Sequence, residues 1–206
     1  YRGYQINLLD TPGHRDFSED TYRVLTAVDA VVMVLDAAKG IEAQTKKLFE
    51  VCRQRGVPIF TFINKCDRPS KGAIELLDEV ESVLNLKPFP VNWPIGDGQD
   101  FKGVYDRLSK KVHLFERTTG GAYIAPVEVG DISDDFVKER VPKEILSKVT
   151  EELEMLEIAG TEFNGNEILA GRTTPVFFGS AMNNFGVELI LQGFLEHAPP
   201  PSGRES

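Results

Sequence analysis

The strongest constraint on the fold is a series of five short apolar runs, with helix-forming stretches between most of them. Three of the runs are continuous β-branched or aromatic segments, which is typical of parallel strands covered on both faces. The runs are QINLL (5–9), AVVMVL (30–35), PIFTFI (58–63), a weaker FPVNW (89–93) and PVFF (175–178). Because strands alternate with helices, we predict an α/β fold with a doubly wound, mostly parallel sheet. The expected helices are 18–28, 41–56, 73–86 and 185–198.

Residues 94–173 interrupt this alternation. They begin with a stretch rich in glycine and turn residues, continue with a candidate strand at 110–117, and contain an acidic amphipathic helix at 141–160. We therefore expect an inserted α+β subdomain. The predicted division is 1–93 for the domain core, 94–173 for the insertion, and 174–206 for the last strand and helix with a proline-rich linker.

Charge and hydropathy exclude several classes of protein. The net charge is -9, and residues 128–157 supply -6 of it. An acidic domain does not favour electrostatic binding of nucleic acid, so we expect no direct DNA binding, while contact with RNA through other domains of a longer protein stays open. The longest apolar run is far too short to span a bilayer, so we expect no membrane contact. The two cysteines make no disulfide framework, which favours reduced thiols and a cytoplasmic location.

The first candidate site is DTPGH, which directly follows the run at 5–9. In α/β sheets, ligands bind beyond the carboxyl ends of strands. Asp10 can hold Mg²⁺, usually through a water molecule, and Gly13 lets a backbone N–H approach a terminal phosphate. His14 can orient an attacking water. The alternative is a simple turn, since Asp10, Pro12 and Gly13 are turn formers flanking Thr11.

The second candidate site is NKCD, which closes the run at 58–63 and begins 54 positions after Asp10. A carboxylate at Asp67 can accept hydrogen bonds from the adjacent N1–H and 2-amino groups of guanine, whereas adenine offers no such pair. Asn64 can meet the other edge of the base or tie loops together, and Lys65 can lay its alkyl stem along the ring. Cys66 occupies the variable position, where packing is the default role. The alternative is a polar loop after a strand.

The third candidate site is GSA, which follows the run at 175–178. Ser180 and Ala181 are small, so their backbone N–H groups can reach the O6 atom of a guanine. Gly-Ser-Ala is common in loops, and the element gains weight only because it comes third, in the expected order.

With these three motifs in place, the sequence resembles the translational GTPases. DTPGH, NKCD and GSA look like the third, fourth and fifth guanine-nucleotide motifs of that family. The run from 8 to 68, WPIGDGQDFKGVYD and TPVFFGSAMNNFGVE resemble the bacterial peptide chain release factor 3 branch more closely than elongation factor G. The likeness covers essentially all 206 residues.

This resemblance implies a P-loop GTPase fold and a ribosome-dependent enzyme that binds GTP or GDP with Mg²⁺. It also implies that the enzyme promotes departure of class-I release factors from the ribosome. By the same resemblance, Asp10 supports Mg²⁺, Gly13 contacts the γ-phosphate and His14 positions the hydrolytic water. The remaining nucleotide-binding positions are Thr11, Pro12, Asn64, Lys65, Cys66, Asp67, Ser180 and Ala181.

One departure from the family pattern matters. No G-x-x-x-x-G-K-[ST] sequence occurs in the chain, and the first switch is missing too. The chain also does not begin with Met, so we expect the first strand and the phosphate loop to lie upstream in a longer protein. The 206 residues alone are then expected to bind nucleotide poorly. Two alternatives remain: an elongation-factor-G-like GTPase, and a non-hydrolysing interaction scaffold that keeps the motifs.

Overall fold

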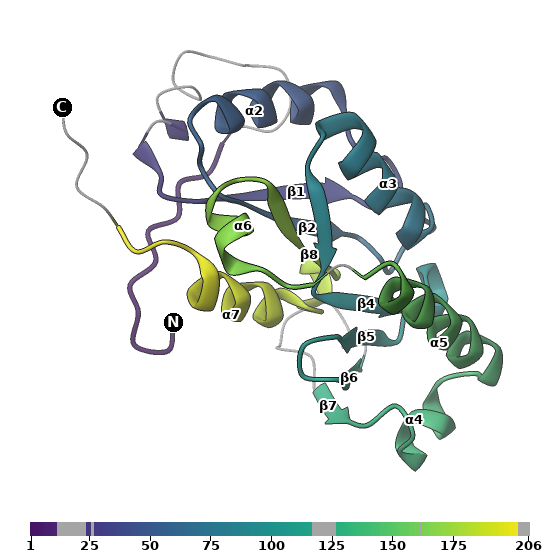
Figure 1. Cartoon of the computed structure of the whole chain (residues 1–206). Coiled ribbons are helices and arrows are strands. Elements are labelled where there is room, and N and C mark those ends of the chain that lie inside the picture. The colour runs from purple at the N-terminus through teal and green to yellow at the C-terminus, as the bar shows by residue number, and fades with distance from the viewer. Residues whose placement is uncertain (12–23, 26, 117–126, 161, 202–206) are drawn as a thin grey trace.

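A four-stranded parallel sheet forms the centre of the domain in the computed structural model, which describes residues 1–11, 24–25, 27–116, 127–160 and 162–201. The strand order is β1-β2-β8-β3 (Figure 1), and every neighbouring pair is parallel. The bounds are β1 (Val31–Asp36), β2 (Ile59–Asn64), β8 (Thr173–Phe178) and β3 (Lys87–Pro90). The runs predicted at 30–35, 58–63 and 175–178 are therefore strands, and their carboxyl ends lie along one edge of the sheet.

Helices lie on both faces of this sheet, as a doubly wound fold requires, although Val32 and Val34 of β1 are exposed on one face. Alternate residues of β2 separate the two layers, because Ile59 and Ile63 belong to one hydrophobic cluster and Phe60 and Phe62 to the other. The first cluster includes buried side chains of α2 and α3, and the second includes those of α6 and α7 (Figure 1). The bounds are α2 (Ala43–Gln54), α3 (Ala73–Leu84), α6 (Gly165–Leu169) and α7 (Val187–His197).

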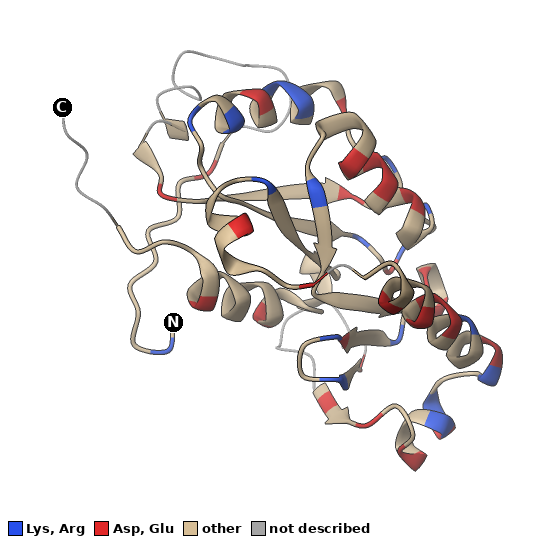
Figure 2. Ribbon diagram, viewed as in Figure 1, with Lys and Arg blue, Asp and Glu red and all other residues tan. Residues whose placement is uncertain are grey.

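The insertion forms a second sheet, which is antiparallel and has the order β4-β5-β6-β7. Its strands are β4 (Asn92–Ile95), β5 (Gly103–Asp106), β6 (Lys111–Phe115) and β7 (Val127–Gly130), followed by α4 (Asp135–Arg140) and α5 (Lys143–Ile158). Two 3₁₀ turns, η1 (Gly98–Asp100) and η3 (Ala181–Asn183), complete the elements. Figure 2 marks acidic residues in red along the ribbons of α3 and α5. Strand β4 spans the expected junction between residues 93 and 94.

One hydrophobic cluster runs through both sheets. Trp93 of β4, Val104 of β5 and Val149 of α5 belong to the same buried cluster as Ile63 of β2 and Leu76 of α3. The ring of Trp93 is fully buried. The insertion therefore packs on the main domain through apolar contacts and not only through its two chain connections.

Two strand predictions were wrong. Residues 5–9 form no strand, and Leu8 is 84% exposed. An apolar run forms a strand only where a neighbouring strand satisfies its backbone, and among the described residues this segment has no sheet partner. Just before this segment, Arg2 forms a solvent-exposed ion pair with Glu188 of α7 at 3.2 Å.

The run at 89–93 is also not a single strand. It divides into the end of β3 and the start of β4, which belong to different sheets. The side chain of Asn92 explains the division. Its amide donates to the carbonyl of Phe178 at 3.3 Å and its oxygen accepts from the N–H of Phe178 at 2.7 Å, so a side chain and not a strand continues the pairing with β8.

Candidate functional site

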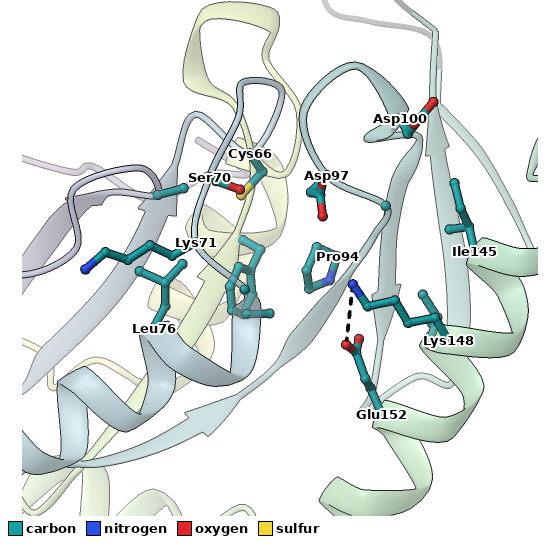
Figure 3. Close-up of a pocket in the computed structure, with 16 residues that line it drawn as sticks. Cys66, Ser70, Lys71, Leu76, Pro94, Asp97, Asp100, Ile145, Lys148 and Glu152 are labelled. Carbon is teal, nitrogen blue, oxygen red and sulfur yellow. Dashed lines mark ion pairs between the residues drawn. The ribbon is translucent and has the colours of Figure 1, made fainter.

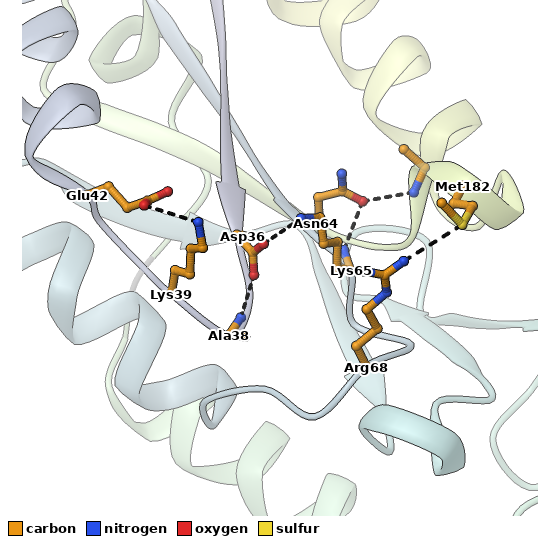
Figure 4. A network of polar contacts seen from close by, with 9 residues as sticks. Asp36, Ala38, Lys39, Glu42, Asn64, Lys65, Arg68 and Met182 are labelled. Carbon is orange, nitrogen blue, oxygen red and sulfur yellow. Dashed lines mark hydrogen bonds and ion pairs between the residues drawn. The ribbon is translucent and has the colours of Figure 1, made fainter. Parts of the chain in front are cut away.

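The loop after β2 is tied to the loop after β8 by the side chain of Asn64. Its oxygen Oδ1 accepts hydrogen bonds from the backbone N–H of Lys65 at 2.8 Å and of Ala181 at 2.9 Å (Figure 4). Two backbone donors require an acceptor between them, so the chemistry fixes which way this amide points. Asn64 therefore links the second and third candidate motifs, which lie more than a hundred residues apart in the sequence.

Lys65 adopts a backbone φ of +70°, in the left-handed region that favours glycine. Its ammonium group reaches Asp36 at the end of β1, with 2.6 Å between Nζ and Oδ2 (Figure 4). The N–H of Ala38 donates to Oδ1 of the same carboxylate at 2.9 Å. Burial alone would raise the pKa of Asp36, but the hydrogen bonds from Lys65 and Ala38 outweigh it and lower that pKa below its ordinary value.

Asp67 is half-buried and faces the loop that follows β8. Its Oδ2 accepts a hydrogen bond from the side-chain amide of Asn183 at 3.0 Å. The same amide donates to the hydroxyl of Ser180 at 3.0 Å, and Ser180 is only 1% exposed. The carboxylate therefore has one fixed partner within the described residues, and its remaining lone pairs are directed outside this contact.

Cys66, between these polar residues, points into the protein. Its thiol donates to the carbonyl of Ile63 at 3.4 Å, and its backbone N–H donates to the carbonyl of Gly179 at 3.1 Å. Burial raises the pKa of the Cys66 thiol to about 12. The residue anchors the loop against β8 and is chemically inert at neutral pH.

The first candidate motif is placed differently. Asp10 is exposed and Thr11 is half-buried, both in irregular backbone. Pro12, Gly13 and His14 lie outside the described residues, as does most of the helix expected at 18–28. The structure thus joins the second and third motifs by hydrogen bonds, while the first is described only at its beginning.

A cavity of about 180 Å³ lies beside the Cys66 loop, between the main domain and the insertion (Figure 3). Ser70 and Lys71 line one side of it, and Lys148 and Glu152 of α5 line the other. Glu152 also accepts a hydrogen bond from Nε1 of Trp93 at 2.8 Å. Sites for drug-sized ligands occupy roughly 300–1,000 Å³, so this cavity is too small for a nucleotide.

The described side chains meet neither the requirements of a metal site with three ligands nor those of a membrane-spanning helix. Within the part of the chain that the structure describes, no three His, Cys, Asp or Glu side chains gather into a site that could hold a metal ion. The exposed carboxylate of Asp10 fits a magnesium ion bound through water, because that ion prefers oxygen ligands and keeps several waters. No helix among the described residues combines the length and the apolar character needed to cross a membrane.

Sequence reasoning missed two residues of this site. Asp36 directly follows the run at 30–35, so the rule that places ligands beyond strand ends was sufficient to find it. Asn183 has no such signal, because nothing in the sequence distinguishes it from Asn184 beside it.

Comparison with known proteins gives consistent results. A family model described as the elongation factor Tu GTP binding domain matches residues 1–200. Proteins named peptide chain release factor 3 are similar over all 206 residues, with 57% identity in Gloeobacter violaceus and 56% in Rippkaea orientalis. The chain spans only 39% and 38% of the length of these two relatives.

A solved structure supports the fold independently. A crystal structure of a protein from Thermus thermophilus superposes with a TM-score of 0.71 at 24% identity, covering 97% of this chain and 31% of that one. This likeness confirms the predicted α/β fold. Because the family match extends over residues 1–200, the chain belongs to the elongation factor Tu GTP-binding domain family.

Proposed function

We propose that these residues form part of the GTP-binding domain of a ribosome-dependent GTPase that acts at translation termination. The observation that carries the proposal is the tie between the loops after β2 and β8. It brings the carboxylate of Asp67 and the backbone of Ala181 to the same edge of the sheet through the Asn64 and Asn183 hydrogen bonds. An acceptor beside backbone donors is the pattern that the Watson–Crick edge and O6 of guanine require.

Guanine recognition would divide between the two loops. Asp67 would accept from N1–H and from the 2-amino group, and this contact would reject adenine. In the structure the N–H of Ser180 donates to the carbonyl of Phe185, and the N–H of Ala181 donates to Asn64. A guanine O6 at this site would therefore share the Ala181 proton with Asn64 or replace Asn64 as its acceptor.

The phosphate side of the site would be formed by the first motif, DTPGH, together with a phosphate loop. We propose that Asp10 holds Mg²⁺ through water, where the ion would neutralise phosphate charge. Gly13 would offer its N–H to the terminal phosphate, and His14 would orient the attacking water. Since no phosphate loop occurs among the 206 residues, it would be supplied by the remainder of a longer protein.

The ribosome and class-I release factors are the proposed partners of that longer protein, which a role on the ribosome would place in the cytoplasm. The support is the name shared by relatives that are 57% and 56% identical over the whole of this chain. We also propose that residues 94–173 act as an inserted subdomain, since they hold most of the second sheet and all of α5. The end of this range returns to the main domain, because α6 packs in the same cluster as α7 and β8 begins at Thr173.

The test is the rate of GTP hydrolysis by the complete protein, with and without purified ribosomes. We expect strong stimulation by ribosomes, followed by faster dissociation of a class-I release factor from termination complexes. Guanine nucleotide binding without stimulation would favour a non-ribosomal GTPase or a scaffold. Stimulation without release-factor dissociation would favour an elongation-factor-like role instead.

A further inference from the structure

We propose that Asn183 is a positioning residue for the guanine-reading carboxylate of Asp67, and so contributes to the choice of base. The inference rests on the guanine-nucleotide function proposed above. Its basis is the pair of hydrogen bonds from the Asn183 amide, 3.0 Å to Oδ2 of Asp67 and 3.0 Å to Oγ of Ser180.

The orientation of the Asn183 amide is set by its surroundings. An amide nitrogen carries two N–H donors, and here one meets a carboxylate and the other a hydroxyl. A flipped amide would place its oxygen against the carboxylate of Asp67, which is repulsive. The side chain therefore has one favourable orientation, and that orientation donates to Asp67.

The backbone that carries Asn183 is firmly anchored. Its N–H donates to the carbonyl of Ser180 at 3.2 Å, within the 3₁₀ turn that ends at Asn183. The turn is closed by two bonds between Ser180 and Phe185, each 2.9 Å long, and the ring of Phe185 is fully buried. The amide is thus held by a short loop that is fixed to the core, as a positioning group must be.

The contact restricts Asp67 without occupying it fully. Each carboxylate oxygen has two lone pairs, so Oδ2 can accept from Asn183 and still accept from a base. Holding one oxygen restricts rotation of the carboxylate, and the two parallel hydrogen bonds to N1–H and the 2-amino group depend on its orientation. The 2-amino group is what separates guanine from hypoxanthine, so Asn183 acts on that discrimination.

The test compares GDP with inosine diphosphate, which lacks the 2-amino group, on the complete protein. We expect Asn183→Ala to reduce the ratio of GDP to inosine diphosphate affinity about fivefold, because the second bond of the pair is lost from a carboxylate free to rotate. Asn183→Asp keeps the shape but opposes two carboxylates, so it should reduce the ratio further. Asn184→Gly is the matched control, because glycine suits its φ of +57° and the ratio should not change.

Several outcomes would overturn the inference. Equal weakening of both nucleotides by Asn183→Ala would indicate a purely structural role, and unchanged binding would indicate no role. Tighter GDP binding would mean that Asn183 competes with the base. If the unmodified protein binds nucleotide but does not prefer GDP to inosine diphosphate, or binds neither, the proposed function fails as well, which separates the two failures.

Discussion

The two ends of the proposed nucleotide site differ in how the fold positions them. The base-reading end lies on loops that follow β2 and β8, neighbouring strands whose register pairs Ile63 with Phe178. Two hydrogen bonds then cross between the loops, one from the N–H of Ala181 to Asn64 and one from the amide of Asn183 to Asp67. The phosphate end begins at Asp10, which is exposed and follows a segment with no strand partner among the described residues. The difference teaches that a sheet positions a motif only when the strand leading to it is paired.

The largest expected effect is at the phosphate end. In the complete protein, His14→Ala should reduce ribosome-stimulated GTP hydrolysis by about 10²–10⁴-fold, the usual contribution of a group that moves or orients a proton. GDP affinity should stay within about twofold, because GDP has no terminal phosphate to be attacked and the proposed base contacts are made by Asp67 and Ala181. Single-turnover hydrolysis and equilibrium GDP binding measure the two effects. Hydrolysis near the unmodified rate would remove His14 from the mechanism.

The second prediction compares the two ends by thiol chemistry. In the 206-residue chain, Leu8→Cys should be alkylated at least about a hundredfold faster than Cys66, because Leu8 is 84% exposed and burial raises the pKa of Cys66 to about 12. Mass spectrometry after iodoacetamide treatment at neutral pH measures both rates. The buried thiol of Cys52, with its pKa raised to about 11, is the internal control for slow reaction. Equal alkylation rates at Leu8→Cys and Cys66 would contradict the difference in exposure between the segment before Asp10 and the loop after β2.

The third prediction concerns the two hydrogen bonds between the side chain of Asn92 and the backbone of Phe178, at the end of β8. Asn92→Ala leaves the N–H and the carbonyl of Phe178 without their buried partner, so it should lower the free energy of unfolding by about 2–4 kcal/mol. Urea denaturation measures the change. Asn166→Ala, at an exposed position of α6, should change stability by less than about 0.5 kcal/mol. Equal losses of stability in the two variants would refute the stabilising role of the Asn92 hydrogen bonds.

The smallest effect is expected at Asp36. Its folded-state pKa lies below the ordinary 3.8, so its contribution to stability is present above that pH and is lost as the pH falls through the folded value. We expect Asp36→Asn to cost less than about 1 kcal/mol near pH 6, since Lys65 is partly exposed.

That cost should shrink as the pH falls below 3.8, because the carboxylate is then progressively protonated. Urea unfolding near pH 6 and at a series of pH values below 3.8 tests the prediction. Asp135→Asn is the control for removing one carboxylate from an exposed position, because the Asp135 side chain is 96% exposed and its loss should change stability little. A larger cost at low pH than near pH 6 would contradict the assigned direction of the pKa shift.

Much of the fold follows from local sequence patterns, but the side-chain contacts of the site do not. Continuous β-branched and aromatic runs identified β2 and β8, because those strands are buried on both faces. The same kind of run identified β1, although Val32 and Val34 are exposed on one face of that strand. The run at 5–9 is also apolar and forms no strand, since composition does not supply a neighbour. The bond from Asn183 to Asp67 joins residues 116 positions apart and depends on a turn whose geometry no local pattern specifies.

The burial of Trp93 has a consequence for how the molecule unfolds. Trp93 is the only tryptophan in the sequence. Its ring centroid lies 5.6 Å from that of Phe178 in the parallel sheet, and its Nε1 donates a hydrogen bond to Glu152 of α5 in the insertion. A core shared across both sheets makes them one cooperative unit. The intrinsic fluorescence of this single indole should therefore follow the melting of both sheets in one transition, coincident with the loss of far-ultraviolet circular dichroism.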